Sequence, residues 1–252
     1  MPENMAAMST SAHQIRDNLD AIHARIQTAA TGAGRSADEI RLIAVSKYMP
    51  AEAVQQAMAA GQFCFGENFV QDAQTKQALL DDPRNEWHFI GHLQTNKARL
   101  IPGNFDWLHT LDSLKLAGKL SAATTASQQP LNVLLQVNIA GDPDKHGLPG
   151  NTVFQFTESL LEAGLQGIKL RGLMTIGRQQ ATTDQRRADF LALRELSEGC
   201  AQRFGRQYFT QLSMGMSDDF ELAISAGATM VRVGSAIFGE RRRATPGSPA
   251  PS

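Results

Sequence analysis

Cysteine is scarce in this sequence, and no hydrophobic run is long. The 252 residues include only two cysteines, Cys64 and Cys200, which lie far apart in the chain. Such a pair excludes a disulfide framework and a cysteine-rich zinc module, and it favours a reduced, cytoplasmic setting. No apolar stretch approaches the roughly 20 residues that span a bilayer. Residues 1–11 lack a basic region followed by an apolar one, so no secretory signal is expected.

An excess of charge of one sign is also absent. Lysine and arginine total 24 against 25 aspartate and glutamate residues, which gives a formal net charge of -1. That balance provides no field to attract nucleic acid or an anionic membrane surface, so neither is expected as a partner. Hydrophobic residues make up 42% of the chain, enough for a substantial core, which excludes a disordered scaffold. The length suits one large domain.

A first helix is predicted from Ser9 to about Thr31, where glycines follow and end it. Its apolar residues recur at three- and four-residue steps and form one stripe, made by Ile15, Leu19, Ile22 and Ile26. The segment 1–8 is expected to be flexible, and the tail 244–252 is expected to be disordered because it has no apolar anchor. The domain itself is therefore expected to cover residues 9–243.

Eight short apolar runs follow the first helix, each bounded by turn residues. The runs span residues 40–46, 62–66, 87–91, 107–111, 132–139, 170–176, 208–214 and 230–234. Helices are predicted between them at about 50–60, 68–80, 94–100, 113–126, 151–164, 183–203 and 218–226. Alternation of this kind predicts βαβ units and a parallel sheet, which makes the fold class α/β. Eight units in roughly 200 residues favour a closed (β/α)8 TIM barrel over an open, doubly wound sheet.

Lys47 ends the first apolar run. Side chains alternate along a strand, so Ile43, Val45 and Lys47 share one face. If that face lines the barrel, the lysine lies at the C-terminal mouth, where barrel enzymes have their active sites. A desolvated amine there has a lowered pKa and becomes nucleophilic toward an aldehyde. The alternative is that Lys47 ends the strand and extends its ammonium into solvent.

Glycine stands beside serine at the ends of the seventh and eighth runs. The seventh ends in Ser213-Met214-Gly215 and the eighth in Gly234-Ser235. Glycine lets backbone N–H groups approach an anion, and the hydroxyl and the following helix supply further donors. The loops after strands seven and eight are the recurrent phosphate site of this fold. Ordinary turn chemistry is the alternative interpretation.

Arg232 lies between two valines in the last run. By strand parity, its side chain points to the same side as Gly234. Burying a guanidinium is costly unless something accepts its hydrogen bonds, so we expect Arg232 to face the anion site. A structural salt bridge to a neighbouring carboxylate is the alternative.

The histidines of the third run indicate no metal site. A lone histidine on an apolar strand, such as His88, is more often a hydrogen-bonded core residue than a base. His88 and His92 are four residues apart, but Gly91 and the strand pattern remove the helical face that a metal-binding i, i+4 pair needs. Asp142 and Asp144 are interpreted as parts of a solvated loop.

Six segments occur in a specific order along the chain. They are residues 42–47 (LIAVSK), 65–68 (FGEN), 87–97 (WHFIGHLQTNK), 170–174 (LRGLM), 212–219 (LSMGMSDD) and 231–239 (VRVGSAIFG). By these segments the chain resembles the family of pyridoxal phosphate homeostasis proteins, which are related to the N-terminal barrel of alanine racemase. The likeness extends from the first helix to Arg241. It implies a single barrel of the alanine racemase N-terminal type, a fold type III pyridoxal phosphate protein, with an extra N-terminal helix.

The resemblance also implies roles for individual residues. Lys47 would hold pyridoxal 5'-phosphate (PLP) covalently as an aldimine, and Arg232 would face the pyridine nitrogen. Asn68 would line the ring pocket, and Lys145, in the loop after the fifth strand, would assist transfer of the cofactor. Parts of that loop, residues 140–147, are less typical of the family. The residues implied at the phosphate are Ser213, Gly234 and Ser235, with backbone donors near Met214 and Gly215.

The implied chemistry favours binding over catalysis. An arginine stays protonated, so Arg232 would donate to the pyridine nitrogen and leave it unprotonated, which weakens the ring as an electron sink. Alanine racemases are similar here, but they add a second domain that supplies a tyrosine base, and no second domain is expected in this chain. Its only tyrosines are Tyr48 and Tyr208, and neither is expected at the mouth as a base.

We therefore predict a cytoplasmic, monomeric protein that is not an enzyme. It binds PLP reversibly and buffers or delivers it, and apo forms of PLP-dependent enzymes are its expected partners. One alternative is a PLP-dependent amino-acid racemase. The other is a barrel that binds a phosphorylated metabolite without PLP.

Overall fold

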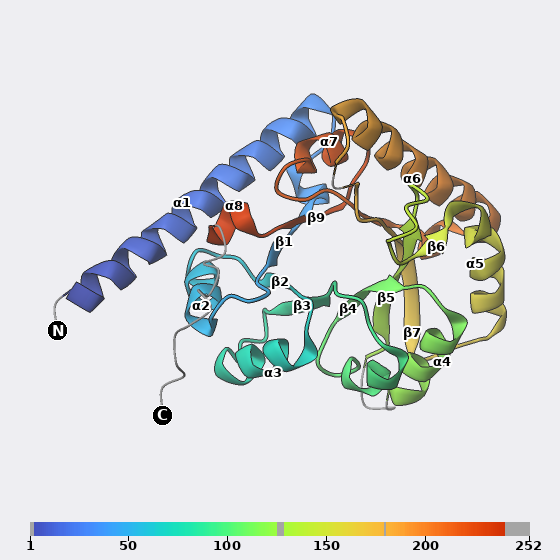
Figure 1. The fold of residues 1–252 in the computed structure, drawn as a ribbon, viewed down its shortest axis with the longest axis horizontal. Helices are drawn as coiled ribbons and strands as arrows, with labels where there is room; N and C mark the ends of the chain where they lie inside the picture. Colours follow the sequence, from blue (N-terminus) through green and yellow to red (C-terminus); the bar gives the residue numbers. More distant parts are fainter. Residues whose placement is uncertain (1–2, 125–128, 179, 240–252) are drawn as a thin grey trace.

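Eight parallel strands close into a barrel that helices surround (Figure 1). The computed structural model describes residues 3–124, 129–178 and 180–239, with side chains described from residue 13 onward. Neighbouring barrel strands follow the order β1-β2-β3-β4-β5-β7-β8-β9, and β9 pairs with β1 to complete the ring. The predicted (β/α)8 barrel is therefore confirmed.

The strands of the barrel separate two apolar layers. They are β1 (Arg41–Val45), β2 (Cys64–Glu67), β3 (Glu86–Phe89), β4 (Trp107–Leu111), β5 (Leu131–Asn138), β7 (Ile168–Met174), β8 (Gln211–Ser213) and β9 (Met230–Val233). The interior cluster consists of Ile43, Trp107, Leu134, Met174 and Met230. On β1, Leu42 and Ala44 point the other way and join the larger cluster between the sheet and the helices.

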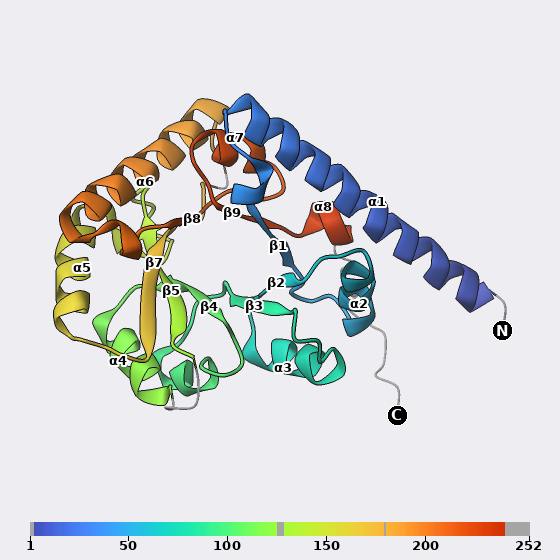
Figure 2. The same cartoon turned by 180° about the vertical axis from the view of Figure 1, so that it is seen from behind.

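The helices cover the outside of the barrel. They are α2 (Ala51–Ala59), α3 (Val70–Leu79), α4 (Leu114–Ala123), α5 (Val153–Glu162), α6 (Thr183–Phe204), α7 (Phe220–Ser225) and α8 (Ser235–Phe238), with 3-10 turns η1 (Ala37–Glu39), η2 (Thr95–Leu100), η3 (Gly150–Thr152) and η4 (Arg206–Tyr208). The long α1 (Glu3–Gly32) lies against α2, α7 and α8 (Figure 2). Its predicted apolar stripe is confirmed, because Ile15, Leu19, Ile22 and Ile26 are all buried.

Several boundaries differ from those expected. Helix α1 begins at Glu3, so it includes most of the segment 1–8 that we expected to be flexible. Strand β8 is shorter than the run 208–214, because η4 ends at Tyr208 and Phe209–Thr210 connect the two. A short strand, β6 (Leu148–Pro149), pairs with β5 and was not predicted, since two residues show no periodicity.

The two ends of the chain bear on two further expectations. The tail 244–252, expected to be disordered, lies outside the described residues. Within the described ranges, no helix combines the length and the apolar character that crossing a membrane requires.

Glycine is required where β7 approaches β8. A Cβ atom built on Gly172 would lie 1.8 Å from the carbonyl oxygen of Gln211. The register between β5 and β7 also shifts near this point. A side chain at position 172 would push β7 and β8 apart, so this glycine allows the strand that carries Ser213 to pair closely with its neighbour.

Candidate functional site

One cavity opens at the C-terminal ends of β1, β8 and β9. It has a volume of about 280 Å³ and is lined by Lys47, Ser217, Arg232, Gly234 and Ser235, together with the Asp218 carboxylate and apolar side chains. An amine, two hydroxyls and a guanidinium thus converge on one small space. This is the end of the barrel at which the fold places its functional sites.

The backbone before Lys47 is fixed by a buried ion pair. The Ser46 hydroxyl donates to Glu67 Oε1 over 2.7 Å, and Lys76 Nζ donates to the Ser46 carbonyl (2.7 Å) and to Glu67 Oε1 (2.6 Å). The side chains of Lys76 and Glu67 are 3% and 0% exposed. Burial raises the pKa of Glu67, while the hydrogen bonds from Lys76 and Ser46 act in the opposite direction. Helix α3 therefore holds the end of β1 in place.

The chain turns sharply after Lys47. Tyr48 has φ of 64°, in the left-handed region that residues other than glycine seldom adopt. Its N–H donates to Asp72 Oδ2 (3.3 Å), and its ring packs on Phe69 with 5.3 Å between centroids. Tyr48 is 60% exposed and is not among the residues that line the cavity. Both neighbours of Lys47 are thus held by α3 and the segment before it.

The opposite wall of the cavity carries hydroxyls and a close backbone approach. The Ser235 hydroxyl donates to Ser217 Oγ over 3.2 Å. A Cβ atom on Gly234 would lie 3.2 Å from the Val45 carbonyl oxygen, so this position brings β9 close to β1 beside Lys47. The first N–H groups of α8, at Ser235 and Ala236, have no partner within the helix and are suited to an anion.

Arg232 is buried between the cavity and the barrel interior. It is 5% exposed, and it donates from Nη1 to Ser213 Oγ (2.6 Å) and from Nη2 to the Thr175 carbonyl (2.8 Å). Burial lowers its pKa to about 10. No carboxylate of the described residues forms an ion pair with it, so the alternative of a structural salt bridge is not what the structure shows.

The structure places Ser213 differently from our expectation. Ser213 is fully buried, and its hydroxyl contacts Arg232 and His109, not the cavity. The Met214 N–H is also engaged, because it donates to the Met230 carbonyl over 3.1 Å. The residues of this segment that reach the cavity are Met216, Ser217 and Asp218, and Ser217 is the one that brings a hydroxyl. The strand ends at Ser213, so the loop beyond it, and not the strand itself, supplies the hydroxyl.

Three other predicted residues lie outside this cavity. Gly215 is buried, and a Cβ there would lie 2.6 Å from Ala223 Cβ, so it packs against α7. Asn68 lines a separate hollow near the ends of β2 and β3, where its buried Oδ1 has no hydrogen-bond partner. Lys145 donates from Nζ to the Gly177 carbonyl (2.7 Å), which connects the loops after β5 and β7.

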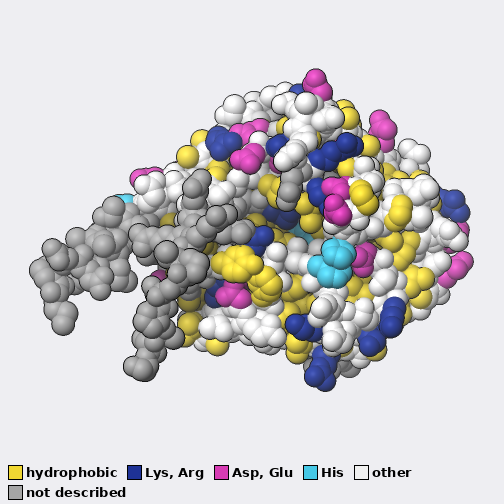
Figure 3. Space-filling view, in the orientation of Figure 1, with side chains coloured by type: hydrophobic (Ala, Val, Ile, Leu, Met, Phe, Trp, Pro, Cys, Tyr) yellow, Lys and Arg dark blue, Asp and Glu magenta, His cyan; other side chains and the backbone are white. Residues whose placement is uncertain are grey.

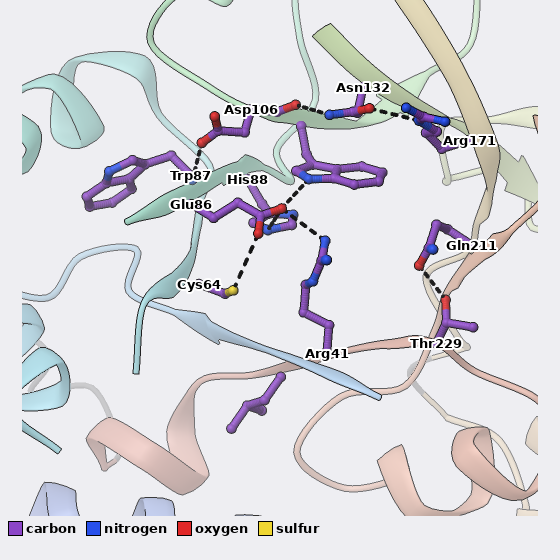
Figure 4. A network of polar contacts seen from close by, with 12 residues as sticks. Arg41, Cys64, Glu86, Trp87, His88, Asp106, Asn132, Arg171, Gln211 and Thr229 are labelled. Carbon is purple, nitrogen blue, oxygen red and sulfur yellow. Dashed lines mark hydrogen bonds and ion pairs between the residues drawn. The ribbon is translucent and has the colours of Figure 1, made fainter. Parts of the chain in front are cut away.

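A hydrogen-bonded chain runs from Arg232 down the barrel interior. Ser213 Oγ lies 2.9 Å from His109 Nδ1, and His109 Nε2 lies 2.9 Å from His88 Nδ1. His88 Nε2 then lies 3.4 Å from Glu86 Oε1, which also accepts hydrogen bonds from Arg41 and Trp107. Figure 4 shows Glu86 and His88 beside Arg41 at the far end of this chain. His88 is fully buried and hydrogen-bonded, in line with its interpretation as a core residue.

The charged groups at the two ends of this chain, Arg232 and Glu86, determine which atoms donate and which accept hydrogen bonds. Burial alone would raise the pKa of Glu86, but its contacts with His88, Arg41 and Trp107 lower it to about 2. Burial lowers the pKa of both His88 and His109, so both imidazoles are neutral. Arg232 can only donate, so the Ser213 hydroxyl donates to His109 Nδ1, His109 donates from Nε2 to His88 Nδ1, and His88 carries its own proton on Nε2. The Ser213 oxygen is then left to accept from Arg232.

Cys64, Glu86 and His88 could in principle hold a metal ion, since one ligand atom from each lies within 4.8 Å of the others. The Arg41 guanidinium already forms an ion pair with the Glu86 carboxylate, with 2.9 Å between Nη1 and Oε1. Burial also raises the pKa of Cys64 to about 12, which disfavours the thiolate that a metal binds. This cluster is therefore a structural network.

Larger hollows exist on the outer surface. One of about 730 Å³ is lined by Arg35, Glu39, Arg194 and Glu198 among others. These charges pair with one another, Arg35 with Glu39 and Arg194 with Glu198. The hollow also lies away from the C-terminal ends of the strands, so it offers no comparable set of groups for chemistry.

Comparison with known proteins agrees with this fold. Residues 18–242 match the model of the alanine racemase N-terminal domain. The pyridoxal phosphate homeostasis protein of Pseudomonas aeruginosa is 44% identical over 234 residues, which cover 93% of this chain and 99% of the relative. The chain belongs to the pyridoxal phosphate homeostasis protein family. The family member of Escherichia coli K12 is 42% identical, with 91% of this chain and 97% of the relative covered.

Solved structures show the same architecture. PipY of Synechococcus elongatus, solved without PLP, has a TM-score of 0.81 and 38% identity, and the match covers 90% of this chain and 100% of PipY. PipY with PLP bound has a TM-score of 0.78 and 36% identity over 90% and 100% of the two chains. Alanine racemase of Corynebacterium glutamicum, at 18% identity and a TM-score of 0.65, shares the fold over 63% of its chain.

Proposed function

We propose that this protein binds pyridoxal 5'-phosphate reversibly and serves its homeostasis, by buffering or delivering the cofactor. The observation that carries the proposal is the convergence of Lys47, Arg232, Ser217 and Ser235 on one cavity. PLP has an aldehyde, a phosphate and a basic ring nitrogen, and these residues offer a matching group for each. The family, and the PLP-bound structure of PipY, support this choice of ligand.

Each residue of the cavity has a distinct part in this proposal. The Lys47 amine attaches the cofactor covalently, as an aldimine with its aldehyde carbon and with release of one water. The hydroxyls of Ser217 and Ser235 and the first N–H groups of α8 hold the phosphate. Arg232 donates to the ring nitrogen, and its position is set by Ser213 and Thr175.

The cavity supports binding better than catalysis. Racemisation needs a proton donor and acceptor on each face of the substrate. In the described part of the chain, no tyrosine or histidine lines the cavity around Lys47, and the one carboxylate that does, Asp218, is solvent-exposed. Tyr48 points outward, and Tyr208 belongs to η4, which precedes β8 and lies at the other end of the barrel. We therefore propose that the protein is not an enzyme.

The exchange of the cofactor completes the proposal. The receivers are apo forms of PLP-dependent enzymes, and the protein acts in the cytoplasm as a monomer. The two cysteines are free, which agrees with a reducing compartment. Lys145 assists release of the cofactor, because its hydrogen bond to the Gly177 carbonyl joins the loops after β5 and β7 beside the mouth.

Absorption spectroscopy tests this function. PLP added to the purified chain should give a yellow adduct that dialysis against a competing amine removes. Lys47→Ala should abolish the adduct, while Lys115→Ala, at an exposed lysine on α4, should leave it unchanged. If the wild-type chain forms no adduct at millimolar PLP, the proposal is refuted. If solvent deuterium exchanges rapidly into the α-carbon of an amino acid, the protein is a racemase instead.

A further inference from the structure

Two histidines and an aspartate meet at the mouth of the barrel, away from Lys47. His92 follows β3, Asp112 follows β4 and His146 lies in the loop after β5. One ligand atom from each lies within 4.8 Å of the other two. Histidine side chains (cyan) gather beside an acidic one (magenta) on the face shown in Figure 3. Three separate loops thus supply one compact set of ligand groups.

The backbone holds two of these residues in place. The buried Gln136 donates from Nε2 to the His146 carbonyl over 3.0 Å, which ties the loop to β5. The buried Thr110 donates to the carbonyl of Gly91, next to His92, over 2.7 Å. Asp112 directly follows the end of β4. The cluster is therefore carried by the rigid rim of the barrel.

The side chains themselves are available to a ligand. His92 and His146 are exposed and Asp112 is half-buried. Among the described residues, no ion pair or hydrogen bond engages the Asp112 carboxylate, although aspartates elsewhere on this surface pair with arginine or lysine. The two imidazoles contact each other instead, stacked with 3.8 Å between centroids and 11° between planes.

We propose that His92, Asp112 and His146 form a binding site for a divalent transition-metal ion of the zinc type. Two imidazoles and one carboxylate are ligands that zinc prefers, at metal–ligand distances of roughly 2.0–2.2 Å. Three protein ligands leave a fourth, solvent-facing position for water or another ligand. The ion connects the loops after β3, β4 and β5.

Binding needs a local rearrangement that the structure permits. A metal ion lies in the plane of each imidazole that binds it, so two parallel stacked rings cannot share one ion. At least one ring must rotate about its side-chain bonds. Both histidines are exposed, so this rotation displaces no buried packing. The site around Cys64 differs, because there Arg41 would have to be expelled.

Titration calorimetry with zinc chloride tests the proposal on the full chain freed of PLP. We expect one equivalent of zinc, and we expect His92→Ala and His146→Ala each to weaken its affinity at least about tenfold. Asp112→Asn should weaken it in the same direction. His23→Ala, an exposed histidine on α1, and Lys47→Ala should both bind zinc like the wild type.

Cobalt provides a second measurement that does not depend on affinity alone. Cobalt(II) should give the intense visible bands of a low-coordinate site in the wild type, and these bands should be lost in His146→Gln. Absence of stoichiometric zinc binding would overturn the proposal. So would zinc binding that persists unchanged in both His92→Ala and His146→Ala, which would indicate scattered surface histidines. Retention of binding in Lys47→Ala separates this site from the PLP cavity.

Discussion

The interior of the barrel and its C-terminal mouth use polar groups in opposite ways. In the interior, polar side chains contact one another in a line that runs from Ser213 through His109 and His88 to Glu86. At the mouth, Lys47, Ser217 and Ser235 converge on a cavity. Arg232 belongs to both regions, since it is anchored from below and lines the cavity above. The comparison teaches that interior hydrogen bonds hold Arg232 in place where it lines the cavity.

Removing the cation of the buried Glu67–Lys76 pair beneath Lys47 should have the largest effect on stability. Lys76→Met leaves Glu67 buried without its cation, which typically costs about 3–5 kcal/mol of unfolding free energy. Urea unfolding should show this loss. The double variant Glu67→Leu/Lys76→Met should recover much of it, because neither buried charge then remains, and Asp72, which also pairs with Lys76, is partly exposed. Equal stability of the single variant and the wild type would contradict the role of this pair.

A pH series should show the contribution of Glu86. Its pKa is about 2 in the folded protein against an ordinary 4.5. A lowered pKa stabilises the fold above pH 4.5, and this contribution, up to about 3 kcal/mol, is lost as the pH falls from 4.5 toward 2. Glu86→Gln should therefore be less stable than the wild type at neutral pH, and the gap should narrow below pH 4.5. Glu52→Gln, at an exposed site, should show no gap.

Ser213, at the end of β8, and Ser217, in the loop that follows, should respond differently to replacement by alanine. Ser217→Ala should weaken PLP binding about tenfold while leaving unfolding unchanged, because it removes a hydroxyl from the cavity wall. Ser213→Ala should lower the unfolding free energy by about 1–3 kcal/mol, because it removes one of the two buried hydrogen-bond partners of Arg232 and one of those of His109. Free phosphate should compete less well for PLP binding in Ser217→Ala only. If instead Ser213→Ala weakened PLP binding and Ser217→Ala lowered only the stability, Ser213 would be the residue that contacts the phosphate.

Tyr48→Phe should have the smallest effect. The Tyr48 side chain is 60% exposed and does not line the cavity, so PLP affinity should change less than about twofold. Absorption titration of the variant beside the wild type measures this. A large loss would mean that the tyrosine hydroxyl reaches the bound cofactor.

Strand parity and fold type made part of the site predictable. Arg232 lies on β9, and Lys47 and Gly234 lie just beyond the ends of β1 and β9; simple alternation along the strand predicted the same side for them, and the structure brings all three to one cavity. Ser217 was not among the predicted residues because the phosphate site was placed at Ser213, where serine and glycine end the run, and the exact residue at which the strand ends is not evident from the sequence. Counting onward from that end would have indicated the second serine of the same segment.

Long-range partners were not predictable from one sequence. His109 lies 104 residues from Ser213 in the chain, and no local pattern indicates that their side chains meet. The same holds for Lys76, which lies buried against Glu67 although lysine side chains are usually exposed. Strand order brings such groups together, and their side-chain packing then decides which of them pair.

Residue-level mapping of the reduced adduct tests the central claim most directly. The protein is saturated with PLP, reduced with borohydride, digested and analysed by mass spectrometry. The account predicts a phosphopyridoxyl group on Lys47, in the segment that follows β1, and none on Lys97 or Lys145. Label found mainly on Lys145 or spread over surface lysines, with Lys47 unmodified, would contradict it.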